Sequence, residues 1–296
     1  MASDTSLRTD RVLPPSALQT PRPEGLALVA VDMDGTFLRP GSTFDRARFA
    51  PLREAMPREG VRFVVASGNQ EAQLLGFFEG EEGGVALAPD AVQSENGSIV
   101  RVGDERLIES AVDGETLSHL IGVLEDADAR GGASWVASGP DGTFIRSSEP
   151  VEMRDYLALY FPQYEAVDSA SDLAGRRVDK VSIVQREGID PALLEELVTA
   201  LGDAMVPVTS GHDSVDVIMP GRHKAFGLDV LLEHWGLGGE QAADFGDSAN
   251  DVEMLRAAGT GVAMSNASQP ALEAADLLAP SNAEDGVLAV LEHWFG

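Results

Sequence analysis

The sequence predicts an α/β protein in which a Rossmann-like parallel sheet core carries an inserted α+β cap domain. The first observation is a series of continuous apolar runs, beginning with LALVAV at 26–31, which is typical of strands buried on both faces of a parallel sheet. The second is that segments of helical periodicity separate these runs. The third is a middle stretch in which this alternation gives way to helices mixed with mostly short strands.

These changes of pattern set the expected domain boundaries. Residues 1–24 are polar and proline-rich, and we expect them to form a disordered tail. The sheet core is expected over 25–111 and 218–296, with the inserted cap over 112–217.

The elements of the first core segment follow from periodicity and turn signals. An Asn-Gly pair at 96–97 is a strong hairpin signal, so two short strands are expected between 99 and 108. The other expected elements are strands at 26–31, 61–66 and 85–91 and helices at 44–58 and 70–78.

The elements of the cap are marked by helical spacing, a Gly-Pro-Asp-Gly turn and a helix start. Asp190 is expected to cap a helix that has Pro191 in its first turn and runs to about 201. Further helices are expected at 115–129 and 151–160, and strands within 134–146, at 180–185, at 206–209 and at 215–219.

The α/β alternation then resumes with a helix that begins at Lys224. We expect strands at 242–245, 261–264 and 277–279, and helices ending near 258, around 270–275 and at 284–294.

Composition narrows the classes of partner. The 296 residues carry a formal net charge of −28, which argues against nucleic acid and anionic membranes. No apolar run approaches a membrane span, and the N-terminus lacks the apolar segment of a signal peptide. Without cysteine the chain has no disulfides, so a cytoplasmic location is expected. The sequence leaves the oligomeric state open.

Two aspartates stand where the first buried strand ends. Side chains alternate along a strand, so Asp32 and Asp34 are expected on one side and Met33 on the other. An acidic turn is one alternative, and a calcium loop is excluded because the glycine stands fourth rather than sixth. Six buried residues leading into the pair favour a catalytic site at the carboxyl edge of the sheet.

Further polar groups stand at other strand ends and helix starts. Ser67 and Gly68 follow the second strand, where a hydroxyl and free amide groups can bind phosphate. Asp247 follows a later strand, with Asn250 and Asp251 in the next helical turn. Carboxylates in oxygen-only surroundings suit Mg²⁺, whereas zinc would call for histidine or cysteine.

The 21 basic residues include only two lysines, Lys180 and Lys224. A lysine kept in an arginine-rich chain is a candidate for a role that needs a compact point charge. Lys224 is expected beside a bound phosphate. For Lys180, chance is an equal explanation.

The order of these motifs resembles the haloacid dehalogenase superfamily of phosphohydrolases. DMDGTFL, Ser67, Lys224 and GDSAND (246–251) are similar to its first to fourth motifs. SENGS (94–98), GVAMSNAS (261–268), NAEDGV (282–287) and the position of the cap resemble the Cof-type subfamily. The segment ASGNQ (66–70) departs from that subfamily, which often carries threonine and then arginine after this glycine.

The resemblance implies a role for each motif residue. Asp32 would be the nucleophile that forms an aspartyl-phosphate, and Asp34 the general acid and then base. Mg²⁺ would be held by Asp32, the backbone carbonyl of Asp34 and Asp247, with Asp251 behind them. Ser67, Gly68, Lys224 and Asn250 would hold the phosphoryl oxygens.

The resemblance also implies that the cap excludes water and selects the leaving group. Arg146, Lys180 and His212 are candidate substrate contacts, although a structural or solvent-exposed position is favoured for each. Tyr156 and Tyr160 stand at helical spacing and are expected in the core of the cap.

The predicted function is hydrolysis of small phosphorylated metabolites, with sugar phosphates as the expected substrates. Nucleotides and flavin mononucleotide stay open as substrates. The alternatives are a phosphoacceptor signalling domain of the receiver type, a non-catalytic phosphate-binding protein and, among enzymes, a sugar phosphomutase. Asp34 and the long insertion argue against a receiver domain.

Overall fold

The computed structural model describes residues 13–130, 133–161, 163–209 and 214–296. The chain forms two compact units, one made of residues up to 61 together with 239–296, and the other of residues 62–238. The second unit contains the predicted cap together with parts of the predicted core, so the predicted boundaries at 111 and 218 stay a prediction.

The first unit is built on the buried parallel strands that the sequence predicts. Its strands are β1 (Leu28–Val31), β14 (Ala242–Gly246), β15 (Thr260–Met264) and β16 (Leu277–Ala279). They lie in the order β16-β15-β14-β1, and every neighbouring pair is parallel. All of β1 is buried, which confirms the interpretation of its apolar run.

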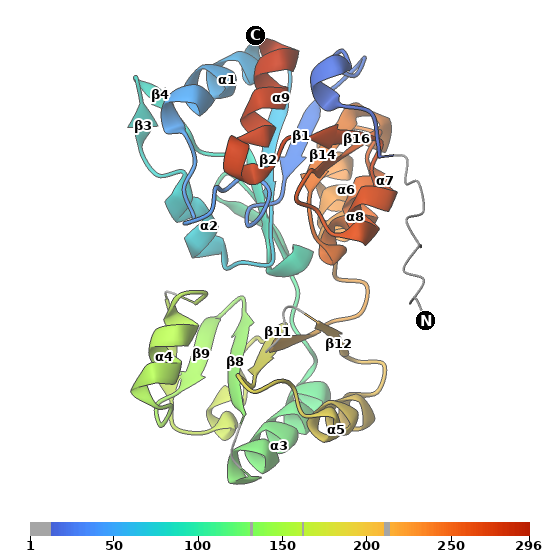
Figure 1. The fold of residues 1–296 in the computed structure, drawn as a ribbon. Helices are drawn as coiled ribbons and strands as arrows, with labels where there is room; N and C mark the ends of the chain where they lie inside the picture. The colour runs from blue at the N-terminus through green and yellow to red at the C-terminus, as the bar shows by residue number, and fades with distance from the viewer. Residues whose placement is uncertain (1–12, 131–132, 162, 210–213) are drawn as a thin grey trace, which may run out of the picture. The chain divides into compact units, whose positions relative to one another are not determined.

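Helices complete this unit where the helical periodicity predicts them. Helices α1 (Arg46–Arg58) and α9 (Gly286–Phe295) pack side by side, as Figure 1 shows. Helices α7 (Val252–Ala257) and α8 (Gln269–Ala274) pack on each other and on β15.

The segment 13–24 is ordered, so the prediction of a disordered tail is wrong for these residues. Residues Ala17–Gln19 form a short 3₁₀ helix, and Ala17 is fully buried. The amide of Leu278 donates a 2.9 Å hydrogen bond to the carbonyl oxygen of Pro15, which adds this segment to the edge of the sheet at β16. The rest of the predicted tail lies outside the described residues.

The second unit begins with β2 (Arg62–Ala66), which pairs in parallel with β5 (Ala91–Ser94). Strands β6 (Ile99–Val102) and β7 (Glu105–Glu109) follow as antiparallel neighbours, in line with the expected strands between 99 and 108. Helix α2 (Glu71–Phe77) follows β2, and α6 (Lys224–Trp235) packs on β5 and β6.

The strand expected at 85–91 is displaced. Its first residues form β4 (Val85–Ala86), which pairs with β3 (Glu81–Glu82), and the parallel partner of β2 starts at Ala91. The reason is local, because Pro89 has no amide to donate and the Asp90 side chain accepts the amide of Phe63 at 2.8 Å.

A second sheet lies in the part of the chain predicted as the cap. Its order is β10-β9-β8-β11-β13-β12, and the pairs are antiparallel except β10 with β9. The strands are β8 (Ser134–Gly139), β9 (Gly142–Arg146), β10 (Glu165–Val167), β11 (Lys180–Val184), β12 (Val206–Thr209) and β13 (Ser214–Ile218).

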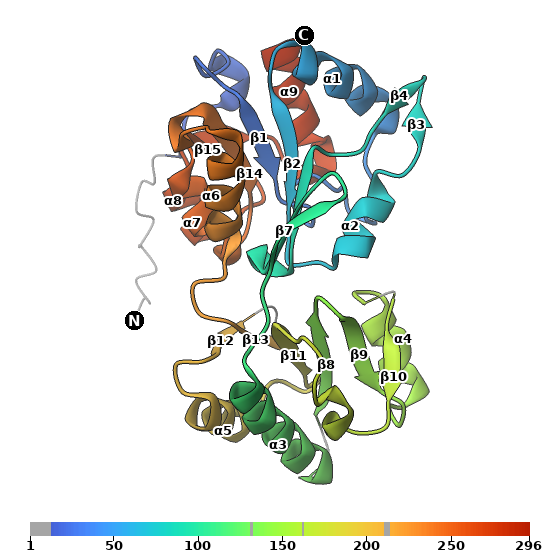
Figure 2. The same cartoon turned by 180° about the vertical axis from the view of Figure 1, so that it is seen from behind.

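Helices cover both faces of this second sheet. Helices α3 (Gly114–Arg130) and α5 (Pro191–Leu201) bury one face, and α4 (Val151–Ala158) packs on the other, as Figures 1 and 2 show. The Asp190 side chain accepts the amide of Ala192 at 2.9 Å, which confirms the predicted N-cap. Within the described part of the chain, no helix is long and apolar enough to cross a membrane.

Candidate active site

Three aspartates of the first unit gather at the carboxyl ends of its strands. Asp32 directly follows β1, and Asp247 directly follows the neighbouring β14. Asp251 ends a short 3₁₀ turn, Ala249–Asp251. One carboxylate oxygen from each lies within 4.8 Å of the others. Asp32 is only 5% exposed and Asp251 is fully buried.

Asp247 is oriented from two directions. The hydroxyl of Thr36 donates a 2.8 Å hydrogen bond to its Oδ1. Its backbone amide and that of Ser248 each donate to Oδ2 of Asp251 at 2.9 Å, so Asp251 caps the loop that carries Asp247. A Cβ atom on Gly35 would lie 2.5 Å from Oδ2 of Asp247, and the φ angle of +83° there also favours glycine.

The residues of this group fit a hard divalent cation. Their donors are carboxylate oxygens, and carboxylates this close repel one another unless a cation or a proton lies between them. Asp244 lies fully buried on β14, where burial and then the charge of Asp251 raise its pKa well above the ordinary value. This shift favours the neutral form of Asp244, which would add no charge beneath the group.

Asparagine side chains hold the loop between Asp32 and Leu38. Asn266 donates from Nδ2 to the carbonyl oxygen of Gly35 at 2.8 Å, and its Oδ1 accepts the amide of Asn282 at 3.0 Å. Asn282 in turn donates from Nδ2 to the carbonyl oxygen of Leu38 at 2.7 Å. The loop that carries the first motif is thus held at two of its carbonyl groups.

The second unit carries the expected phosphate-binding residues. Ser67 follows β2 directly and is buried, and its Oγ accepts the amide of Asn69 at 3.1 Å. Lys224 is the first residue of α6 and is 1% exposed. The imidazole of His223 caps that helix by accepting the amide of Phe226 at 3.2 Å.

Comparison with known proteins identifies the family. Residues 29–291 match the family described as haloacid dehalogenase-like hydrolase. The chain belongs to the haloacid dehalogenase-like hydrolases. This confirms the resemblance found in the motifs, including the Cof-type resemblance.

Relatives of this haloacid dehalogenase-like hydrolase are named as phosphatases. It is 35% identical over 268 residues to the 5-amino-6-(5-phospho-D-ribitylamino)uracil phosphatase YbjI of Escherichia coli, covering 90% of this chain and 95% of that protein. It is 28% identical over 241 residues to an HMP-PP phosphatase of Escherichia coli, covering 81% and 84%. The solved structure of SMU.1108c from Streptococcus mutans has a TM-score of 0.77 at 28% identity, covering 90% and 98%.

These findings establish the reaction class. The chain is a phosphatase that acts on small phosphorylated metabolites, as the sequence predicts. The alternatives of a receiver domain and of a non-catalytic phosphate-binding protein are set aside for that reason.

The predicted motif residues of this hydrolase divide between the two units. The first unit brings Asp32, Asp247 and Asp251 together, while Asp34 is exposed and its carboxylate is not part of the close group. Asn250 lies on the same turn as Asp251, and its Oδ1 accepts the hydroxyl of Ser248. The second unit holds the phosphate-binding candidates Ser67, Gly68 and Lys224.

The predicted contacts in the cap have different outcomes. Arg146 binds the carboxylates of Asp128 and Glu149, the structural role that was favoured. Tyr156 packs on the core below α4, but Tyr160 is 56% exposed, so its prediction as core is wrong. Tyr160 lies beyond the end of α4, so the helical periodicity does not determine the direction of its side chain. His212 lies outside the described residues.

Sequence reasoning missed Thr36, Asn266, Asn282 and Glu95 as individual residues. Each stands inside a segment that carries the family resemblance, but a segment by itself does not say which of its side chains makes a distant contact.

Proposed function

We propose that this phosphatase is a Mg²⁺-dependent phosphomonoesterase that works through an aspartyl-phosphate on Asp32. The observation that carries the proposal is the close group of Asp32, Asp247 and Asp251 carboxylates, with a further acid, Asp34, two residues after the first. A cation beside Asp32 and a separate exposed acid are the parts that hydrolysis by a carboxylate nucleophile needs.

The aspartates would divide the chemistry among them. A carboxylate oxygen of Asp32 attacks phosphorus and displaces the alcohol, to which Asp34 gives a proton. Asp34 then takes a proton from the water that releases phosphate. Mg²⁺, held by Asp32, the backbone carbonyl of Asp34 and Asp247, would neutralise charge on the phosphoryl group. Asp251 supports this set through the loop of Asp247.

The residues that hold the phosphate group would not contact the rest of the substrate. Ser67, Gly68, Lys224 and Asn250 are the proposed set, and the burial of Lys224 favours a fixed charge there over a mobile one. The leaving group must therefore be recognised elsewhere, and we assign that role to the cap, residues 112–217.

We propose a phosphorylated sugar or sugar-like polyol as the substrate. The family-level resemblance supports sugar phosphates. The YbjI relative is named for a substrate whose phosphate is on a ribityl chain, which is also a polyol. A sugar phosphomutase is the alternative within this class, and it would convert a sugar 1-phosphate into its 6-phosphate without releasing phosphate.

The test is release of inorganic phosphate from a panel of phosphorylated metabolites with Mg²⁺. We expect activity on polyol and sugar phosphates, loss of activity in excess EDTA, and recovery when Mg²⁺ is restored. Asp32→Asn should abolish turnover and leave the fold intact, whereas the matched control Asp104→Asn, at an exposed turn, should stay active. Full activity in EDTA, or wild-type rates in Asp32→Asn, would refute the proposal.

A further inference from the structure

Lys180 reaches from the start of β11 to the segment expected to bind phosphate. Its side chain is buried, and Nζ donates a 3.0 Å hydrogen bond to the carbonyl oxygen of Gly68. The same Nζ lies 2.6 Å from Oε2 of Glu95, whose side chain is also buried. Burial alone would lower the pKa of Lys180, but the carboxylates of Glu95 and Asp216 raise it above the ordinary value. Lys180 therefore stays charged.

The neighbouring carbonyl groups are held from the same side. We call residues 67–69 the phosphate loop. The carbonyl oxygen of Ser67 accepts the amide of Asn96 at 3.0 Å, and that of Asn69 accepts the amide of Glu95 at 3.2 Å. Together with the bond from Lys180, these contacts hold every carbonyl group of the phosphate loop.

Fixing these carbonyl groups also fixes the amide groups that follow them. In a planar trans peptide the C=O and N–H groups point in opposite directions, and the described chain has no cis peptide. The amides of Gly68, Asn69 and Gln70 are therefore directed away from Lys180 and the turn at 95–97. One of them, the amide of Asn69, donates a 3.1 Å hydrogen bond to the hydroxyl oxygen of Ser67.

The turn at 95–97, which is hydrogen-bonded to the phosphate loop, has an unfavourable backbone conformation. Glu95 and Asn96 have φ angles of +49° and +55°, a region that residues other than glycine rarely adopt. This conformation directs the Glu95 carboxylate to Lys180 and its amide to the phosphate loop. A Cβ atom on Gly97 would lie 2.7 Å from the carbonyl oxygen of His223, so the turn also packs against the start of the helix that carries Lys224.

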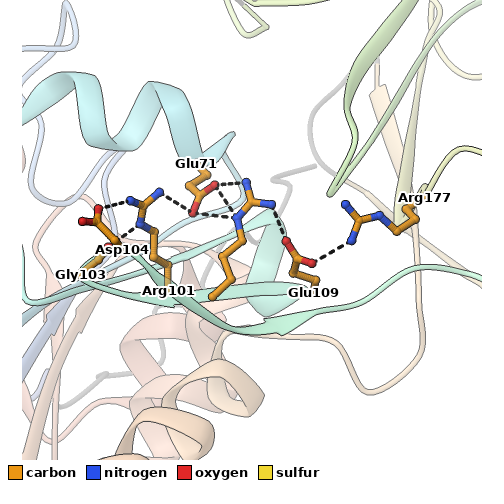
Figure 3. A network of polar contacts seen from close by, with 7 residues as sticks. Glu71, Arg101, Gly103, Asp104, Glu109 and Arg177 are labelled. Atoms are coloured by element: carbon orange, nitrogen blue, oxygen red, sulfur yellow. Dashed lines mark hydrogen bonds and ion pairs between the residues drawn. The ribbon is translucent and has the colours of Figure 1, made fainter.

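A chain of ion pairs ties the segment before Lys180 to the helix after the phosphate loop (Figure 3). Arg177 donates to Glu109 at 2.8 Å, and Arg106 bridges Glu109 to Glu71. Glu71 is the first residue of α2. These contacts hold the start of β11 in place independently of Lys180.

We propose that Lys180 is a positioning residue for phosphate binding, because its ammonium group fixes the Gly68 carbonyl and the Glu95 carboxylate and so directs the amide groups of the phosphate loop. This inference rests on the proposed phosphate-binding role of Ser67 and Gly68. A compact ammonium group fits between the Gly68 carbonyl and the Glu95 carboxylate, whereas the planar guanidinium of arginine has a different shape and donor pattern. The role accounts for a lysine at this position in an arginine-rich chain.

Binding of inorganic phosphate distinguishes this positioning role from a direct contact between Lys180 and the leaving group. The amide groups would contact phosphate, which every substrate shares, so losing Lys180 weakens binding of all substrates and of inorganic phosphate alike. If Lys180 instead contacted the leaving group, binding of inorganic phosphate would not change.

The experiment measures binding of inorganic phosphate by calorimetry, in the presence of Mg²⁺, and the KM and kcat for p-nitrophenyl phosphate. For Lys180→Met we expect the Kd of phosphate and the KM to rise by about tenfold, with a smaller loss of kcat. Lys180→Arg should not restore binding. Because Lys180→Met leaves the buried Glu95 carboxylate without its positive partner, we also use Lys180→Met/Glu95→Gln, which removes both charges and should show the same rise.

Arg146→Met is the matched control, because Arg146 also forms ion pairs in the same sheet, although partly buried ones, and its ion-pair partners are Asp128 and Glu149 rather than the phosphate loop. It should lower the melting temperature and leave the Kd of phosphate unchanged. A folded double variant with wild-type affinity for phosphate would overturn the role of Lys180, as would a wild-type protein that binds no phosphate. Absence of Mg²⁺-dependent turnover in a wild type that binds phosphate would instead refute the proposed function, and the Kd values would still decide the role of Lys180.

Discussion

The hydroxyl group of Thr36 donates a 2.8 Å hydrogen bond to Oδ1 of Asp247, which joins the loop after β1 to the loop after β14. Thr36 is buried, so the hydroxyl has little competition from water. The contact fixes one oxygen of a carboxylate that belongs to the close acidic group. A residue outside that group thus sets the geometry of the proposed cation site.

Thr36→Val keeps the shape of the side chain and removes the donor. We expect the Mg²⁺ concentration for half-maximal activity to rise by about 10–100-fold, the usual effect of losing a hydrogen bond that orients a metal ligand. Thr36→Ser keeps the hydroxyl group and is the control. The measurement is a Mg²⁺ titration of phosphate release at saturating substrate, and an unchanged midpoint in Thr36→Val would show that the bond does not support cation binding.

Asn266→Ala should slow turnover without unfolding the protein. The substitution removes the hydrogen bond to the Gly35 carbonyl and the acceptor for the amide of Asn282. Since the side chain is exposed, we expect a loss of about three- to tenfold in kcat, consistent with one ordinary hydrogen bond. Ser265→Ala, at the exposed neighbouring position, should leave kcat unchanged. Equal kcat values for the two variants would mean that the asparagine does not hold the catalytic loop.

The strands and the acidic residues at their ends were predictable because their signals are local. The run before Asp32 is continuous and apolar, and the structure buries all of β1. Parallel strands place their carboxyl ends at one edge, so Asp32 and Asp247 were expected to lie near each other, and one oxygen from each is within 4.8 Å. Their positions directly after two parallel strands are enough to bring these two residues together.

The contacts that support the site were not predictable, since they join distant parts of the chain. Asn266 and Gly35 are 231 residues apart, and periodicity carries no information about such a pair. The same limit explains segment 13–24, whose composition suggests disorder but whose backbone extends an existing sheet edge at Leu278. Tertiary contacts decide both cases.

Asp179→Asn should stabilise the protein at neutral pH. Asp179 is fully buried, and burial followed by the negative charge of Glu95 raises its pKa well above the ordinary value of 3.8. Lys180 and Ser98 also face it and act in the opposite direction. Because the unfolded state gives up this proton at a lower pH than the folded state, the free energy of unfolding falls as pH rises above about 4.

Asparagine has no such proton, so its advantage should be largest at pH 8 and should disappear as pH approaches 4. The measurement is thermal unfolding of both proteins between these values. Asp155→Asn, which changes an exposed acid on α4, should show no comparable dependence on pH. A difference in melting temperature that does not vary with pH would mean that Asp179 ionises alike in both states.

The last prediction concerns Asp34, which is exposed and whose carboxylate is outside the close acidic group. That placement favours proton transfer over direct ligation of the cation. A sugar alkoxide is a poor leaving group and needs a proton, whereas p-nitrophenolate leaves readily without one. General acid catalysis is typically worth ~10²–10⁴-fold, so Asp34→Asn should slow the first step by this factor for an alkyl phosphate and much less for p-nitrophenyl phosphate.

The second step needs a base to activate water, and it should be slow in Asp34→Asn with either substrate. With p-nitrophenyl phosphate the variant should therefore release a burst of p-nitrophenol, followed by slow turnover while the aspartyl-phosphate accumulates. With an alkyl phosphate no burst should occur. Rapid-mixing kinetics on both substrates gives the measurement, and Asp32→Asn, which cannot form the intermediate, is the control that should show no burst. If the first step slows equally for both substrates and no burst is seen, Asp34 is neither the acid nor the base, and its role is to support the loop or the cation.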